Sequence, residues 1–179
     1  MKKIILSAAM MVIVLSTGKS FGQTSGTANL SITLSNVMSI TITDPPAVNF
    51  DSEAKYTNGI TNLATNNITV VSSGPYVVKA VAGTITGTSL LDAGSVLITA
   101  ANGAGGGNFD GITSYPSDVV LPASGSTEAT IISSTETTWV GAVAATKFDV
   151  TYKIGTGGQY AGKPFAVNTI PVVYTVALP

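Results

Sequence analysis

The stretch that decides the fold is Lys147-Phe148-Asp149-Val150-Thr151-Tyr152-Lys153-Ile154. Apolar or aromatic side chains occupy every second position of this stretch, and charged or hydroxyl-bearing side chains occupy all four alternate positions. Because successive side chains of a β-strand point to opposite faces, the alternation predicts a strand with one face on a core and the other in water. Antiparallel sheets produce this pattern when one of their faces is solvated.

Further stretches rich in Val, Ile, Thr and Ser repeat this pattern along the chain, and no comparable helical stripe follows residue 22. Breaks containing Gly or Pro separate them, at Asp44-Pro45-Pro46, Asn58-Gly59, Ser73-Gly74-Pro75 and Gly155-Thr156-Gly157-Gly158. We therefore expect strands at residues 30–42, 67–72, 76–82, 95–100, 118–121, 129–133, 147–154 and 164–178. Strands at this spacing predict an all-β fold, namely an antiparallel β-sandwich of immunoglobulin-like or jelly-roll-like type.

The first 22 residues differ from the rest of the chain. Two lysines precede an apolar run over residues 4–15, and small residues flank an aromatic one at the end, up to Gly22. A basic start, about a dozen apolar residues and a small-x-small end are typical of a secretory signal peptide, and the run is too short to span a membrane. We expect a signal peptide over residues 1–22, one β-sandwich domain over residues 23–179, and a secreted protein that is extracellular or at the cell surface.

The composition excludes several classes of function. The chain has no Cys and no His, and residues 23–179 hold five Lys, no Arg and nine Asp plus Glu, so their net charge is 5 − 9 = −4. Nucleic-acid binding requires a positive surface that neutralises phosphates, so we expect no nucleic-acid partner. A catalyst near neutral pH usually needs a group that titrates there, and His or Cys normally supplies it. We therefore expect no enzyme, no catalytic residue, no cofactor and no metal.

The first predicted strand, residues 30–42, is unusually long. It places Leu30, Ile32 and Leu34 on one face, and at about 3.3 Å per residue it would extend about 40 Å, twice the usual length. Such a strand either bends near Asn36 and switches sheets, or it projects and completes the sheet of a neighbour. The second alternative predicts a structural subunit of a surface filament or matrix, a homo-oligomer whose assembly strand carries Leu30, Ile32 and Leu34.

Aromatic residues are few, at 7% of the chain. Exposed aromatic side chains on a β-sandwich commonly stack on sugar rings or anchor a partner protein. We predict that Tyr76, Trp139 and Tyr174 lie near each other and partly exposed, and that they bind an envelope glycan or a partner surface protein. The alternative for each of these residues is a position in the core.

Several phrases occur in an order that resembles the WxL surface domain. They are Val48-Asn49-Phe50, Ile68-Thr69-Val70, Ser73-Gly74-Pro75-Tyr76-Val77-Val78-Lys79-Ala80, Tyr160-Ala161-Gly162 and Tyr174-Thr175-Val176. In that family two Trp-x-Leu phrases stand at comparable places, where this chain has Tyr76-Val77-Val78 and Tyr174-Thr175-Val176. The resemblance implies a secreted β-sandwich that attaches non-covalently to bacterial cell walls.

The closing stretch, residues 158–167, resembles the terminal hairpin of the spore coat protein U and chaperone-usher pilin families. This resemblance is shorter, and it implies a secreted subunit whose terminal strand pairs with a neighbour. Two other motifs are weaker. Ser52-Glu53-Ala54-Lys55 has the S-x-x-K spacing of penicillin-recognising enzymes, but no helical pattern surrounds it and the partner motifs are missing. The Gly-rich stretch 102–111 is similar to one calcium-binding repeat, and we expect a flexible loop there.

Overall fold

The computed structural model describes residues 27–33, 35, 37–87, 91–105, 111–135 and 146–179. The chain divides into two compact units, residues 1–34 and residues 35–179. The predicted signal peptide lies outside the described residues, as does the Gly-rich stretch from residue 106 to residue 110. None of the helices in the described ranges is long and apolar enough to cross a membrane.

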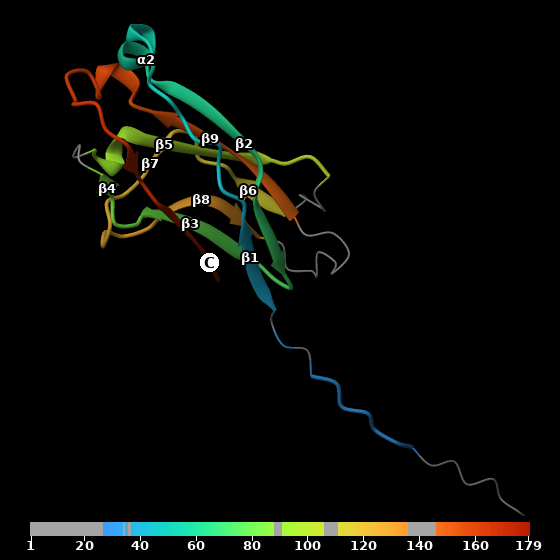
Figure 1. Ribbon diagram of the computed structural model, residues 1–179. Helices are drawn as coiled ribbons and strands as arrows, with labels where there is room; N and C mark the ends of the chain where they lie inside the picture. The colour runs from blue at the N-terminus through green and yellow to red at the C-terminus, as the bar shows by residue number, and fades with distance from the viewer. Residues whose placement is uncertain (1–26, 34, 36, 88–90, 106–110, 136–145) are drawn as a thin grey trace, which may run out of the picture. The chain divides into compact units, whose positions relative to one another are not determined.

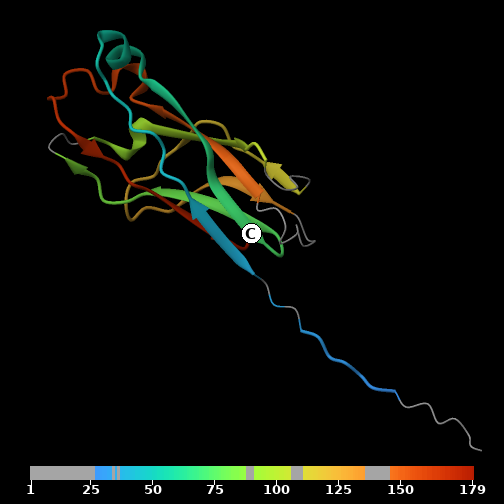
Figure 2. The same ribbon diagram turned by 45° about the vertical axis from the view of Figure 1, so that its right-hand side comes forward.

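Residues 35–179 form an antiparallel β-sandwich, which confirms the predicted fold class (Figures 1 and 2). The order of strands in the first sheet is β1 (Met38–Ile42), β2 (Ile60–Ser72), β9 (Thr146–Ile154), β5 (Val96–Asn102) and β7 (Val119–Val120). In the second sheet it is β11 (Val172–Ala177), β3 (Tyr76–Ala82), β8 (Ala129–Ser134) and β6 (Ile112–Ser114). The shorter elements are the strand pair β10 (Asn168–Thr169) with β4 (Thr86–Gly87), helix α2 (Glu53–Asn58), and the 3-10 turns η1 (Ala93–Ser95) and η2 (Thr156–Gly158).

Strand β9 lies at the centre of the first sheet, between β2 and β5. Its residues Phe148, Val150 and Tyr152 are buried in the core, as the alternation predicted, whereas Ile154 and the side chains predicted to lie in water are half-buried. The second sheet closes the core from the other side, because Val78 of β3 and Ile132 of β8 are fully buried in the same cluster. One hydrophobic core between two sheets therefore holds this unit together without a disulfide.

The thirteen-residue strand of this protein is β2, which extends the predicted strand 67–72 by seven residues toward the N-terminus. Its pairing with β9 shifts register between Ala64 and Ile68, at a bulge where Asn66 has a left-handed φ of 48°. The Asp149 carboxylate accepts a hydrogen bond from the Asn66 N–H at 2.7 Å, which satisfies a backbone donor that the bulge frees from the ladder. The bulge also turns Asn67 into the core, where 1% of its surface is exposed.

The prediction of a strand over residues 30–42 is wrong in extent, because β1 covers only Met38–Ile42. A strand needs a hydrogen-bonded neighbour, and Met38 is opposite Ser72, the last residue of β2. Beyond this pair Val37 and Ser73 continue the contact, and each N–H donates to an oxygen of the other residue. Within β1 the predicted alternation holds for Met38, Ser39 and Ile40, but Ile42 at the end of the strand is exposed.

Three other local predictions need correction. A short helix, α2, follows Ser52, although the sequence around Ser52 and Lys55 carries no helical pattern. The Lys55 ammonium contacts the Asp51 carboxylate at 2.7 Å and the Asn49 carbonyl at 3.1 Å. Residues 48–50, a short strand in the resemblance to the WxL domain, have no regular structure here. The predicted strand 164–178 is divided into β10 and β11 around Pro171, whose carbonyl accepts the Gly83 N–H.

Candidate functional site

The structure does not place Tyr76 at the surface. Tyr76 begins β3 and is 4% exposed, so its ring packs in the core and presents no face to a ligand. Burial raises the pKa of its hydroxyl above the ordinary value of tyrosine. Trp139, the second predicted contact residue, lies outside the described residues.

Tyr174, the third predicted contact residue, is half-buried and belongs to a polar network inside the sandwich. Its hydroxyl lies 2.5 Å from the hydroxyl of Tyr152, and Tyr152 in turn donates to Oδ1 of Asn67 at 2.9 Å. The Asn67 amide donates to the carbonyl of Thr43. Burial raises the pKa of both tyrosines. Because Tyr174 comes from the second sheet and Tyr152 and Asn67 from the first, the network joins the two sheets.

The predicted assembly residues lie near the N-terminus. Leu30 and Ile32 are 84% and 72% exposed, and the intervening Ser31 and Thr33 are exposed as well. The described residues 27–33 have no regular structure, and Leu34 lies outside the described residues. The segment thus carries two large apolar side chains in solvent, at the two-residue spacing of a strand face.

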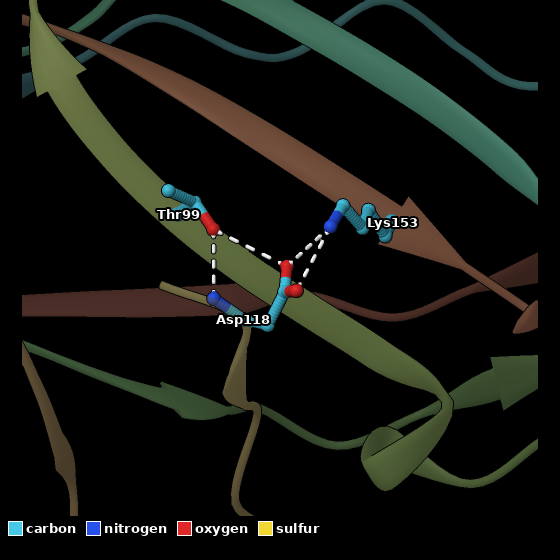
Figure 3. A network of polar contacts seen from close by, with 3 residues as sticks. All are labelled: Thr99, Asp118 and Lys153. Carbon is cyan, nitrogen blue, oxygen red and sulfur yellow. Dashed lines mark hydrogen bonds and ion pairs between the residues drawn. The ribbon is translucent and has the colours of Figure 1, made fainter. Parts of the chain in front are cut away.

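Among the described strands, two of the four edges of the sandwich's two main sheets are protected against further pairing. Strand β7 has only two residues, and strand β6 has three with an irregular register against β8. Beside β7 the Lys153 ammonium of β9 contacts the Asp118 carboxylate at 2.7 Å, and the Asp118 N–H donates to the hydroxyl of Thr99 of β5 at 2.8 Å (Figure 3). Short strands, irregular pairing and charges at an edge are the usual devices that prevent unwanted strand pairing.

The other two edges, β1 and β11, lack these devices. They have five and six residues, pair regularly with their neighbours and contain no charged residue. They also lie on the same side of the sandwich. The core-facing side chains of these two strands are half-buried, namely Met38, Ile40, Val172, Tyr174 and Val176. By contrast, the core-facing residues of β3, the neighbour of β11, are buried. This side of the sandwich is therefore an incompletely covered part of the core.

Sequence reasoning connected the C-terminal region with strand pairing through the resemblance of residues 158–167 to terminal hairpins, but it did not single out the β11 edge. The composition of Val172–Ala177, without charge or internal proline, is the signal that could have revealed it. Comparison of the chain with protein-family models, curated proteins and solved structures found no match. The function is therefore argued from the chain's own geometry.

Proposed function

We propose that this protein is a non-catalytic, exported surface subunit that assembles by β-strand addition, with residues 30–34 of one copy pairing with β11 of the next. The observation that carries the proposal is the exposure of Leu30 and Ile32 at strand spacing in a molecule with an uncharged, regular sheet edge. The predicted signal peptide supports export, because it is the feature of the sequence that directs a chain out of the cell.

The chemistry of the two partners is complementary. A strand added beside β11 extends the second sheet, and its apolar face then covers the half-buried side chains Val172 and Val176. Burial of Leu30 and Ile32 contributes roughly 1.5–3 kcal/mol each. The alternate residues Ser31 and Thr33 would stand on the outer face of the sheet, where hydroxyl groups meet water.

The first test changes one face of the assembly segment at a time. We expect the double variant Leu30→Asp/Ile32→Asp to be monomeric in sedimentation velocity, because a charged face cannot enter the core. The matched control Ser31→Asp/Thr33→Asp places the same charges on the outer face and should still assemble. A monomeric wild-type protein, or equal assembly of both variants, would contradict strand addition.

The second test locates the acceptor strand by disulfide cross-linking. The chain contains no cysteine, so every disulfide must join the introduced residues. Ser31→Cys is mixed with a second single-cysteine variant under oxidising conditions, and disulfides between different copies are detected by mass spectrometry. Val173→Cys on β11 should cross-link, because paired strands bring Cα atoms within the roughly 4.4–6.8 Å that a disulfide needs. Val120→Cys on β7 is the control. A cross-link only to Thr41→Cys of β1 would exclude β11 as acceptor but leave assembly intact.

Attachment to an envelope glycan is separated from self-assembly by co-sedimentation with purified cell-wall sacculi. Strand addition predicts that wild-type protein pellets without sacculi once assembled, and that Leu30→Asp/Ile32→Asp stays in solution with or without them. If wild-type protein pelleted only when sacculi are present, glycan attachment would replace self-assembly as the function.

A further inference from the structure

A groove of about 610 Å³ lies between the loop that precedes α2 and the loop that precedes β10. Its volume falls within the roughly 300–1,000 Å³ typical of small-molecule sites. The groove does not include Leu30 or Ile32, and it shares only Val172 of β11 with the proposed assembly contact. Most of its lining is apolar or aromatic, with residues from both loops, β5, β9 and β11.

The floor of the groove is an aromatic cluster. The ring of Phe50 lies 5.1 Å from the ring of Tyr160 and 5.5 Å from that of Tyr56, measured between centroids. The Tyr160 hydroxyl lies 2.6 Å from the hydroxyl of Ser95, which fixes the ring from below. Gly155 packs against this cluster, and a Cβ there would lie 2.9 Å from the Tyr160 ring. The cluster is therefore held in place before any ligand arrives.

The walls of the groove are two similar apolar loops, Pro45-Pro46-Ala47-Val48 and Pro164-Phe165-Ala166-Val167. The amide of Asn62 donates to the Pro46 carbonyl at 2.8 Å, and the amide of Asn168 donates to the Ala166 carbonyl at 3.3 Å. Phe165 is 97% exposed and Val167 is 86% exposed, which is unusual for large apolar side chains that stand together. Such a surface indicates an apolar ligand.

Polar groups narrow the class of ligand further. Three of the wall residues are prolines, which offer no N–H donor, and two wall carbonyls already accept hydrogen bonds from the Asn amides. A sugar or an extended peptide needs many hydrogen-bond partners and would find few on these walls. Among the described residues that line the groove, Lys163 is the one with a charged side chain, and the Asp92 carboxylate lies in the adjoining pocket that Lys163 and Tyr160 also line.

We infer that this groove binds an acyl chain with an anionic head group. In this proposal the acyl chain lies along Phe50 and between the two apolar loops, and its anionic head group lies beside the ammonium of Lys163. The inference is independent of strand addition. The ligand could come from free fatty acid or from lipid in a membrane, since both present the same chemistry.

The test uses palmitate, palmityl alcohol and vesicles with the full protein, with binding followed by displacement of a fluorescent fatty-acid probe. Phe165→Ser should weaken palmitate binding by roughly tenfold or more, because it removes one buried phenyl ring from the complex. Lys163→Gln should weaken binding of palmitate and leave binding of palmityl alcohol unchanged. Val120→Ser and Lys79→Gln, which remove an exposed apolar side chain and a lysine outside the groove, should bind as wild type does.

Vesicles of phosphatidylcholine with one fifth phosphatidylglycerol distinguish the sources. Binding of palmitate that is sensitive to both groove variants, with no vesicle binding, assigns the groove to single free acyl chains. Vesicle binding with the same sensitivity assigns it to membrane lipid. If palmitate does not bind, or if Phe165→Ser and Lys163→Gln change its affinity no more than the two controls do, the inference is wrong.

Discussion

Replacing Asn67 with Ala removes the centre of the network that joins the two sheets. The amide of Asn67 loses its bonds to Tyr152 and to the Thr43 carbonyl. The Tyr152 hydroxyl can then donate to Tyr174, which already lies 2.5 Å away, and the Thr43 carbonyl belongs to an exposed residue that water reaches. No buried partner is therefore left without a hydrogen bond.

The magnitude follows from this count. Two hydrogen bonds contribute about 1 kcal/mol each, and the cavity left by the amide in a fully buried position adds about 1 kcal/mol. We expect Asn67→Ala to lower the free energy of unfolding by about 2–4 kcal/mol. Urea denaturation of the variant and of wild type, followed by circular dichroism, measures the difference.

Asn58→Ala is the matched control, because it removes an exposed amide at the end of α2 and should change stability by less than about 0.5 kcal/mol. If Asn67→Ala cost less than about 1 kcal/mol, or no more than the control, the network would not join the sheets in the way its hydrogen bonds indicate.

Two further predictions concern pH and backbone. The chain has no His or Cys, so the free energy of unfolding should be nearly constant from about pH 6 to 9. Burial raises the pKa of the Tyr152 and Tyr174 hydroxyls in the folded protein, so the unfolded state loses their protons at lower pH. The free energy of unfolding should therefore fall above about pH 10. Urea midpoints against pH test this, and an unchanged midpoint at about pH 11 would contradict it. Gly155→Ala should cost more than about 2 kcal/mol, since φ is 66° and the new Cβ meets Tyr160, whereas Gly157→Ala, with φ of 69° and open space, should cost about 1 kcal/mol in thermal unfolding. Equal losses would show that the contact with Tyr160 does not matter.

Much of the sandwich could be predicted because local punctuation and side-chain alternation agree with the tertiary structure. Strand β3 has the predicted bounds, Tyr76–Ala82, since Pro75 precedes it and Gly83 follows it. Strand β9 begins one residue before its predicted start. In both strands one face is buried, so the period of two is visible in the sequence.

The first half of β2 was not predictable in the same way. Its exposed positions include Leu63 and its half-buried positions include Asn62, the reverse of the usual pattern. The bulge before Ile68 then shifts the phase of the strand, and only the structure reveals that shift. The start of β1 at Met38 could not be predicted for another reason. The alternation of apolar and polar residues extends back to Leu30, but the pairing strand β2 ends at Ser72, opposite Met38.

The candidate sites were harder to predict than the fold. Tyr76 and Tyr174 were chosen as surface aromatics, but strand alternation assigns both to core-facing positions of the second sheet. No periodic pattern surrounds Phe50 or Phe165, so the sequence alone does not mark either residue as a ligand contact. Their meeting at one groove depends on loops that are distant in the sequence, and no local signal encodes that arrangement.

The unequal protection of the four sheet edges sets the number of neighbours that one copy can have. In the proposed assembly, strand addition would be confined to the side of β1 and β11, because β6 is short and irregularly paired and β7 is short and flanked by an ion pair. A copy that pairs its residues 30–34 with one neighbour and its β11 with another would contact two neighbours, and both contacts would be head-to-tail. Contacts of that kind generate open linear polymers unless the rotation between copies closes a ring. The geometry of the edges thus favours a filament over a two-dimensional layer.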